Sequence, residues 1–234
     1  MWVKICGLKK LDQVLMAAEL GADAVGFVFE RKSPRYVTPA EAVPQALILG
    51  KKAQKVGVFW HSPALEVAGL ADAAQLDFVQ IHPPSKETLR PFVAEVRRYL
   101  KLGRKATGII LALSLGEGGY TPEGMAEEVA ALSPDMVLVE SPKKEGLPGG
   151  QGKAWEWGRL QDVRKAFSDR GLDVPLILAG GLNPGNVQKA LDEARPDGVD
   201  VSSGVEKDGQ KDRDSMAAFL KAVREWQAHD GVGG

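Results

Sequence analysis

Short apolar runs rich in β-branched residues alternate along the chain with longer segments in which apolar residues recur every three or four positions. The short runs are typical of buried strands, and the longer segments are typical of amphipathic helices. The expected strands cover residues 3–7, 24–29, 55–60, 78–83, 106–113, 136–140, 175–181 and 198–204. The expected helical segments cover residues 12–23, 38–50, 62–75, 85–100, 121–133, 154–171, 183–194 and 212–227.

This alternation predicts parallel strands joined by right-handed helical crossovers. An open doubly wound sheet would alternate in the same way. Eight strand–helix units in 234 residues, with no linker rich in Pro, Gly or Ser, favour a closed (β/α)8 TIM barrel, an α/β fold. We expect one domain over residues 1–228 and a frayed tail over residues 229–234. Thr38 is expected to cap the second helix, with Pro39 in its first turn.

Charge and composition exclude several classes of partner. Lys and Arg total 30 against 31 Asp and Glu, so the net charge of −1 gives no indication of a nucleic-acid or anionic-membrane partner. The sequence has no apolar run of about 18 residues and no signal-peptide pattern. With its single cysteine, the chain is expected to be cytoplasmic. It could be a monomer or a homodimer, and Phe59, Trp60 and Leu65 could belong either to an interface or to the core.

The single cysteine, Cys6, ends the first apolar run, VKICG. A lone cysteine is more often a small buried hydrophobe than a reactive group. Strand alternation places Lys4 and Cys6 inside the barrel and turns Val3 and Ile5 toward the helices. The first and last strands are neighbours in a closed barrel, so Lys4 is expected to pair with Asp200 for structural reasons.

Other polar residues are expected at the carboxyl ends of the strands, where (β/α)8 barrels place their chemistry. Gln80 and His82 share the inward face of the fourth strand, and Glu140 ends the sixth. Arg35 lies in the loop after the second strand, where it could bind a carboxylate or be a solvated charge. His61 and His82 could instead be metal ligands. With three histidines and no HxH or HExxH spacing, we expect no metal.

Two glycine-containing stretches, AGGLNPGN (179–186) and SSGVEKDG (202–209), follow the seventh and eighth strands. Loops at these two positions are the usual phosphate site of this barrel, although both could be ordinary turns. The stretch GLPGGQGK (146–153) is long enough for a lid and does not match the Walker A pattern.

The sequence closely resembles the phosphoribosylanthranilate isomerase family of tryptophan biosynthesis over nearly its whole length. The motifs that carry the resemblance are KICGL (4–8), GADAVGFVF (21–29), SPRYV (33–37), KVGVF (55–59), VQIH (79–82), GGQGKAWEW (149–157), LAGGLNPGNV (178–187) and VDVSSGVEKDGQKD (199–212). The resemblance implies a (β/α)8 barrel that needs no cofactor. It implies an Amadori rearrangement of N-(5′-phosphoribosyl)anthranilate to 1-(2-carboxyphenylamino)-1-deoxyribulose 5-phosphate.

The resemblance also implies roles for individual residues. Cys6 would be the general base, and the position of the family's aspartate acid is occupied by Glu140. Cations near the thiol would lower its pKa, and an apolar barrel mouth would raise that of the carboxyl. Arg35 would hold the anthranilate carboxylate. The other expected contacts are Gln80 and His82 for the substrate and Gly180, Gly181, Ser203 and Gly204 for its phosphate.

Two features depart from the family pattern. Glutamate replaces aspartate at 140, which changes the placement of the acid, and VQIHPP replaces the usual VQLHG, which stiffens the loop after the fourth strand. Other functions remain as alternatives. One is another barrel enzyme acting on a phosphosugar, such as a ribulose-phosphate epimerase or an indoleglycerol-phosphate synthase. The other is a non-catalytic barrel that binds a phosphorylated metabolite.

Overall fold

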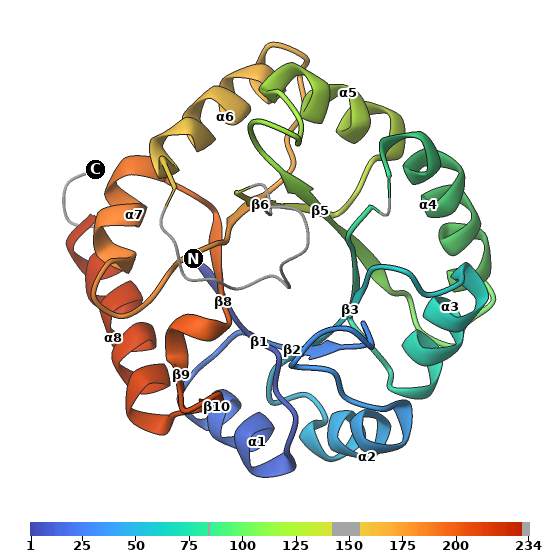
Figure 1. Ribbon diagram of the computed structural model, residues 1–234, viewed down its shortest axis with the longest axis vertical. Helices are drawn as coiled ribbons and strands as arrows, with labels where there is room; N and C mark the ends of the chain where they lie inside the picture. Colours follow the sequence, from blue (N-terminus) through green and yellow to red (C-terminus); the bar gives the residue numbers. More distant parts are fainter. Residues whose placement is uncertain (84, 142–154, 231–234) are drawn as a thin grey trace.

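In the computed structural model, eight parallel strands close into a barrel in chain order, and helices surround it (Figure 1). The structure describes residues 1–83, 85–141 and 155–230. The barrel closes where the first and last strands pair, with Lys4 beside Asp200 in the register. The predicted (β/α)8 barrel is therefore confirmed.

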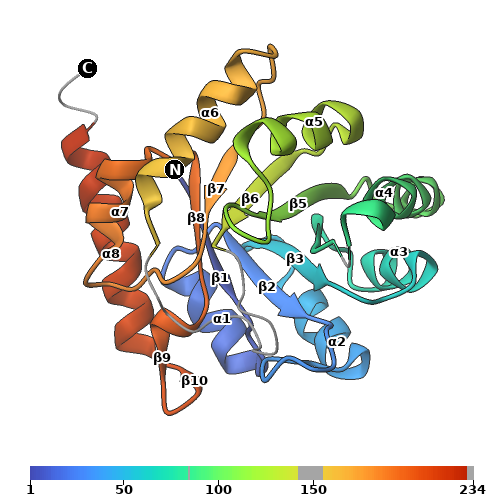
Figure 2. The same ribbon diagram turned by 45° about the horizontal axis from the view of Figure 1, so that its top comes forward.

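Each strand is followed by a helix that packs on the outside of the barrel (Figure 2). The strands are β1 (Trp2–Cys6), β2 (Ala24–Val28), β3 (Gln54–Phe59), β4 (Phe78–Ile81), β5 (Gly108–Ser114), β6 (Met136–Glu140), β7 (Leu176–Leu178) and β8 (Gly198–Val201). The helices are α1 (Leu11–Glu19), α2 (Pro39–Leu49), α3 (Ala64–Ala73), α4 (Lys86–Leu100), α5 (Pro122–Leu132), α6 (Leu160–Ser168), α7 (Val187–Ala194) and α8 (Arg213–Asp230). No described helix is both long and apolar enough to cross a membrane.

Period-two alternation divides the apolar residues into two cores. Val3 and Ile5 belong to the large core between the strands and the helices, as expected. A smaller cluster fills the barrel interior and includes Val56, Ile110 and Leu138. Two members of this cluster, Leu138 and Ala179, also line the cavity at the carboxyl ends of the strands.

The ends of several elements differ from the sequence-based prediction. β7 and β8 are shorter than expected, because Gly180 and Gly181 adopt positive φ angles of 89° and 72° and Ser203–Val205 forms a 3-10 turn, η2. A second 3-10 turn, η1 (Trp157–Arg159), precedes α6. α7 begins only at Val187 because residues 183–186 form side-chain-capped turns. These glycines and turns lie in the loops where the phosphate site was expected.

Two further features lie in and after the loop that follows β8. A short hairpin, β9 (Glu206–Lys207) and β10 (Gln210–Lys211), extends this loop and was not predicted. α8 continues to Asp230, so it includes the first two residues of the expected tail.

The start of α2 follows the prediction. Thr38 Oγ1 accepts a hydrogen bond from the Glu41 amide at 3.3 Å, and the Glu41 carboxylate accepts one from the Thr38 amide at 2.9 Å. Together with Pro39 in the first turn, these bonds form a capping box that sets where the helix begins.

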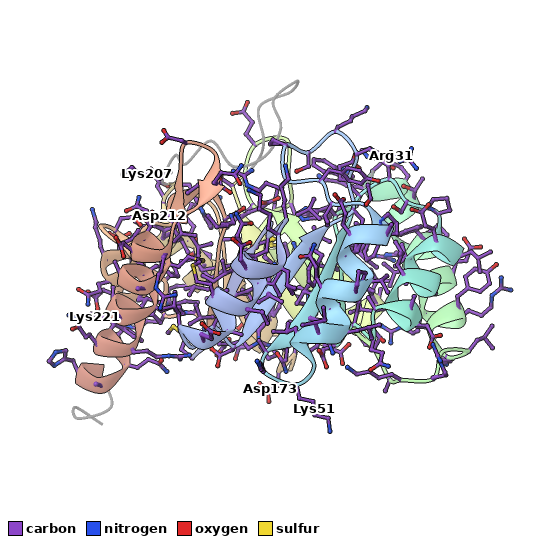
Figure 3. All side chains as sticks on the ribbon, turned by 90° about the horizontal axis from the view of Figure 1, so that it is seen from below. Arg31, Lys51, Asp173, Lys207, Asp212 and Lys221 are labelled. Carbon is purple, nitrogen blue, oxygen red and sulfur yellow. The ribbon has the colours of Figure 1, made fainter. Side chains whose placement is uncertain are left out.

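The candidate interface residues have different positions. Phe59 is 1% exposed and stacks on Phe29 with ring centroids 5.1 Å apart, so it belongs to the core. Leu65, in contrast, is 64% exposed on α3. Figure 3 shows the barrel from the side, with Arg31 and Lys207 toward the end where the strands finish.

Candidate active site

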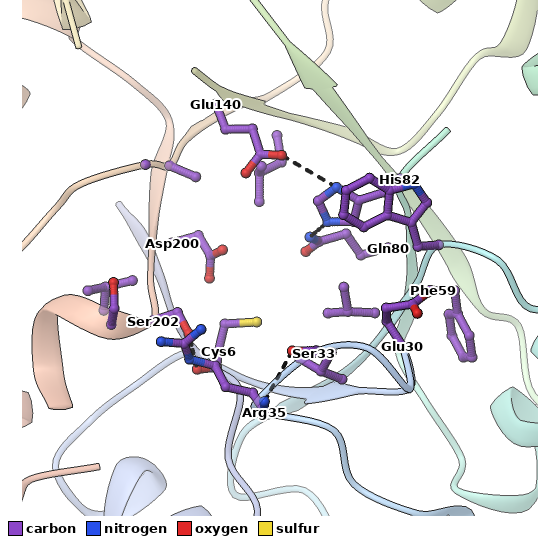
Figure 4. A pocket seen from close by; sticks show the side chains of 18 of the residues that line it. Cys6, Glu30, Ser33, Arg35, Phe59, Gln80, His82, Glu140, Asp200 and Ser202 are labelled. Carbon is purple, nitrogen blue, oxygen red and sulfur yellow. Dashed lines mark hydrogen bonds and ion pairs between the residues drawn. The ribbon is translucent and has the colours of Figure 1, made fainter. Parts of the chain in front are cut away.

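A cavity of about 550 Å³ lies at the carboxyl ends of the strands (Figure 4). It brings together nearly all of the residues predicted for the site from the sequence. The predicted residues that line it are Cys6, Arg35, Gln80, His82, Glu140, Gly180, Gly181 and Ser203. Gly204 is not among the described residues that line the cavity.

Two glycines make room for Cys6 and for its neighbour Arg35. Gly26 on β2 pairs with Cys6 in the register, and a Cβ at Gly26 would lie 2.8 Å from the Cys6 sulfur. Gly7, directly after the cysteine, has a φ of +78°, and a Cβ there would collide with the Arg35 side chain. The sequence CG at 6–7 therefore allows the thiol and the guanidinium to enter the same cavity.

Burial raises the pKa of the Cys6 thiol above its ordinary value. The residue is 7% exposed, so the thiolate would lose most of its hydration. Lys4 and Lys211 lower the pKa and Asp200 raises it, and the two cations do not offset the cost of burial. The two cations act in the expected direction, but the expected net lowering of the pKa is wrong, because burial outweighs them.

Glu140 ends β6 and extends into the cavity from the side opposite Cys6 (Figure 4). One of its carboxylate oxygens lies 3.5 Å from His82 Nδ1. The other ring nitrogen of His82 lies 2.9 Å from Gln80 Nε2. The acid and the thiol thus face each other across one space, and a histidine contacts the acid.

Lys4 lies below the cavity and is completely buried. Its ammonium lies 3.1 Å from Asp200 and donates to Gln80 Oε1 at 2.8 Å. Burial by itself would lower the pKa of Lys4, but Asp200 and then Cys6 outweigh it and raise the pKa. The predicted Lys4–Asp200 pair is confirmed, and Lys4 remains a cation at neutral pH.

Arg35 is not a solvated surface charge, since its side chain is 15% exposed. Its Nε and Nη2 donate to the two oxygens of Glu206 at 2.7 and 2.8 Å. This bidentate hydrogen bond raises the pKa of Arg35. Glu206 also accepts from Lys211 Nζ at 2.6 Å. Burial would raise the pKa of Glu206, but hydrogen bonds from Arg35 and Lys211 hold it below its usual range.

The sequence-based prediction did not include Glu206 or Lys211. Both lie in the stretch VEKDGQKD, part of a motif that carries the family resemblance, but neither was given a role of its own. Lys211 also donates to the carbonyl of Ser202 at 2.9 Å, and the Ser202 hydroxyl donates to the carbonyl of Cys6 at 3.0 Å. The hairpin therefore fixes both Arg35 and the end of β8 against the end of β1.

The loops after β7 and β8 lie against each other. At Gly204 the backbone approaches the carbonyl of Leu182 so closely that a Cβ would not fit. The indole nitrogens of Trp155 and Trp157 donate to the carbonyls of Ala179 and Gly180, at 3.0 and 3.4 Å. These contacts fix the glycine loops that the sequence indicated for a phosphate. The expected lid at 146–153 lies outside the described residues.

Trp60 forms an aromatic wall of the cavity that the sequence did not predict. Its ring stacks on His61 and on His82, with centroids 5.5 and 5.6 Å apart. His61 Nδ1 also lies 2.8 Å from Glu30. Among residues 1–83, 85–141 and 155–230, no group of three or more His, Cys, Asp or Glu side chains could hold a metal ion.

The fold and the cavity define the class of this protein as a (β/α)8-barrel enzyme with its site at the carboxyl ends of the strands. The family model described as N-(5′-phosphoribosyl)anthranilate (PRA) isomerase matches residues 3–222. The chain belongs to this family.

Curated relatives agree in sequence. The N-(5′-phosphoribosyl)anthranilate isomerase of Pseudomonas fluorescens (strain Pf0-1) is 38% identical over 222 residues, which cover 94% of this chain and 97% of the relative. The isomerase of Thermotoga petrophila is also 38% identical, over 95% of this chain and 98% of its own length.

Solved structures agree in fold. The phosphoribosyl anthranilate isomerase of Thermotoga maritima matches with a TM-score of 0.77 and 34% identity, over 96% of this chain and 99% of that one. A structure of a phosphoribosyl anthranilate isomerase in complex with reduced 1-(o-carboxyphenylamino)-1-deoxyribulose 5-phosphate matches with a TM-score of 0.74 and 31% identity. It covers 96% of this chain and 99% of that chain.

Proposed function

We propose that this chain catalyses the Amadori rearrangement of N-(5′-phosphoribosyl)anthranilate in tryptophan biosynthesis, with Glu140 as general acid and Cys6 as general base. Membership of the isomerase family supports the reaction. One geometric observation carries the assignment of roles: the thiol and the carboxyl extend into one cavity from opposite sides (Figure 4). A sugar between them would meet an acid on one side and a base on the other.

The reaction begins with transfer of a proton from Glu140 to the ring oxygen of the ribosyl group. The bond between this oxygen and C1′ breaks, and the electron pair on the anthranilate nitrogen forms the C1′=N bond of an iminium ion. Cys6 then removes the proton from C2′, and the electrons of the C–H bond neutralise the iminium. The resulting enolamine tautomerises to the ketone product. No cofactor is needed, because the protonated imine accepts the electrons of the C–H bond.

Because the pKa of Cys6 is raised, the thiol must first release its own proton to solvent before the thiolate can accept the C2′ proton, and a positive charge nearby favours that release. The iminium ion is such a charge, and it arises in the step before the base is needed. A nearby cation favours the ionised form of a thiol. Lys4 and Lys211 act in the same direction, so the substrate cation adds to an existing field.

The remaining polar groups of the cavity are proposed to hold the two anionic ends of the substrate. Arg35 is oriented by Glu206, which accepts hydrogen bonds from its Nε and Nη2, and Arg35 is proposed to hold the carboxylate of the substrate. The backbone of Gly180, Gly181 and Ser203 borders the same cavity and is proposed to bind the phosphate. Gly204 is proposed to contribute indirectly, by letting the two loops pack together.

The proposal is tested by turnover of freshly made substrate. Turnover is followed as the loss of anthranilate-type fluorescence, with and without a chelator. Wild-type protein should turn over, whereas Cys6→Ser and Glu140→Ala should each lose at least about 10²-fold in kcat. Glu140→Asp should retain activity well above Glu140→Ala, since it keeps a carboxyl but withdraws it by one methylene. Binding without turnover in the wild type would instead support the non-catalytic barrel. Turnover that a chelator abolishes would contradict a mechanism that uses only the acid and the base of the chain.

The assembly and location of the protein remain predictions. The Thermotoga maritima isomerase is described as dimeric, and a monomer or a homodimer is expected here. Sedimentation equilibrium distinguishes the two. A cytoplasmic location stays an expectation from the sequence alone.

A further inference from the structure

A line of polar side chains crosses the barrel from Asp200 on β8, through the buried Lys4, to Glu140 on β6. All of its members except Lys4 line the cavity. We propose that Lys4 and Gln80 form a positioning relay that fixes the tautomer of His82, so that His82 presents a proton on Nδ1 to Glu140. The inference rests on the proposed function, because it treats Glu140 as the general acid. It adds two residues that act through others.

The relay begins with an unambiguous donor. The Lys4 ammonium carries three N–H groups and no acceptor, so its contact at 2.8 Å must be with the carbonyl oxygen of Gln80. Asp200, 3.1 Å away, holds the ammonium from the other side. Although Lys4 is fully buried, Asp200 and then Cys6 raise its pKa, so it stays charged at neutral pH.

The orientation of the Gln80 amide then determines which ring nitrogen of His82 carries the proton. With its oxygen toward Lys4, the amide turns its NH2 group toward His82 Nε2 at 2.9 Å. An NH2 group is a donor only, so His82 Nε2 must be the acceptor. A neutral imidazole carries one proton, which therefore lies on Nδ1, the nitrogen that faces Glu140.

The position of the ring is fixed independently of the relay. The His82 amide donates to the carbonyl of Phe59 at 2.9 Å, and Trp60 stacks on the imidazole with ring planes 25° apart. The Nδ1–Oε1 distance of 3.5 Å is longer than a strong hydrogen bond, and a small movement of the Glu140 side chain would shorten it. Hydrogen bonds of this kind often tighten only with the substrate bound.

This arrangement acts on the chemical step rather than on binding. As Glu140 gives its proton to the substrate through one oxygen, the other oxygen gains negative charge. A hydrogen bond from His82 Nδ1–H strengthens as the carboxyl becomes a carboxylate. Loss of the relay should therefore lower kcat and leave KM nearly unchanged.

The first test is the tautomer itself, read by nitrogen-15 NMR of the imidazole rings in the wild-type protein. The chain has three histidines, so a His61→Gln and a His82→Asn variant suffice to assign the signals, with exposed His229 as the solvent reference. We expect His82 to be protonated on Nδ1 and unprotonated on Nε2 at neutral pH. A proton on Nε2 in the wild type would overturn the proposal without any variant.

The second test is Gln80→Glu, which keeps the shape of the side chain and its acceptor toward Lys4. A carboxylate cannot donate to His82 Nε2, so Nε2 should become protonated. The kcat should fall roughly tenfold, part of the 10²–10⁴-fold that a general acid supplies. The matched control is Gln188→Glu, whose amide donates to the carbonyl of Ala222 between α7 and α8, and which should keep wild-type kinetics.

The outcomes separate the relay from the proposed function. A large rise in KM with unchanged kcat in Gln80→Glu would mean that Gln80 contacts the substrate directly, which overturns the relay. Wild-type turnover together with an Nε2-protonated His82 would also overturn the relay and leave the isomerase proposal intact. Wild-type protein that binds substrate without turnover would defeat the proposed function, whatever the tautomer.

Discussion

At Cys6, burial and charge act in opposite directions on one thiol. Loss of hydration raises the pKa, two lysine cations lower it, and burial dominates. A buried thiol that is protonated at rest costs the folded state nothing, whereas a permanent buried thiolate would destabilise it. The proposed role of Cys6 as a base therefore depends on a cation beside the thiol that favours loss of its proton.

The raised pKa of Cys6 gives a prediction that the single cysteine makes simple to measure. The rate of alkylation by iodoacetamide should rise with pH around a midpoint above that of the same chain in urea, where the thiol has a pKa of about 8.5. The sign for stability follows. Ionisation occurs first in the unfolded chain, so the contribution of Cys6 to stability is complete below about pH 8.5 and is lost as the pH rises. A midpoint in the folded protein below that in urea would contradict the effect of burial.

Arg35 carries a second prediction at this scale. Removing a bidentate charge-assisted contact to a substrate carboxylate should cost about 1.5–3 kcal/mol of binding, so Arg35→Ala should raise KM roughly 10- to 100-fold. Glu206→Gln weakens the contact that orients the guanidinium and should raise KM less. Steady-state kinetics measure both variants. An unchanged KM in Arg35→Ala would mean that this arginine acts only within the protein, on Glu206.

At the scale of the element, the space beside β1 is set by a glycine on β2. A methyl group at Gly26 would lie 2.8 Å from the Cys6 sulfur and 3.1 Å from its Cα, and neither the buried strand nor the thiol can move away easily. Gly26→Ala should therefore lower the free energy of unfolding by about 1–3 kcal/mol and reduce kcat by displacing the base.

Gly69, within α3, provides the matched control. A Cβ there would meet nothing within 4 Å, and its φ is not positive. Gly69→Ala should therefore stabilise the protein by about 0.5–1 kcal/mol through helix propensity, with kinetics unchanged. Urea denaturation measures the stability of the two variants, and steady-state kinetics measure their kcat. Equal effects of the two substitutions would show that the strand pair tolerates the extra methyl group.

The period-two pattern of the strands made most of the cavity predictable. Residues on the inward face, such as Gln80, His82 and Glu140, follow directly from counting along a strand. Contacts between loops could not be derived in this way, because no sequence pattern places Glu206 on β9 beside Arg35 in the loop after β2. The direction of the Cys6 pKa shift also could not be predicted from the sequence, because it depends on how deeply the folded chain buries the thiol.

At the scale of the whole molecule, the Lys4–Asp200 pair joins the first and last strands. Asp200→Ala would leave a buried ammonium without its carboxylate, and it should lower the free energy of unfolding by about 3–5 kcal/mol. The double variant Lys4→Met/Asp200→Ala should recover part of this loss, because the uncompensated charge is gone. Denaturation of the two variants and the wild type measures the difference. A double variant less stable than Asp200→Ala would contradict an electrostatic origin.

The same pair bears on how the protein is made. A ribosome releases residue 4 long before residue 200, so during most of synthesis the lysine has no carboxylate to meet inside a barrel. Burial of the Lys4 ammonium in a partial chain would cost free energy, because no carboxylate would be there to pair with it. The inner face of the first strand is therefore expected to stay in contact with water until then. Premature closure around fewer strands is disfavoured for the same reason. The buried lysine therefore favours closure of the barrel only after the eighth strand, which carries Asp200, has been synthesised.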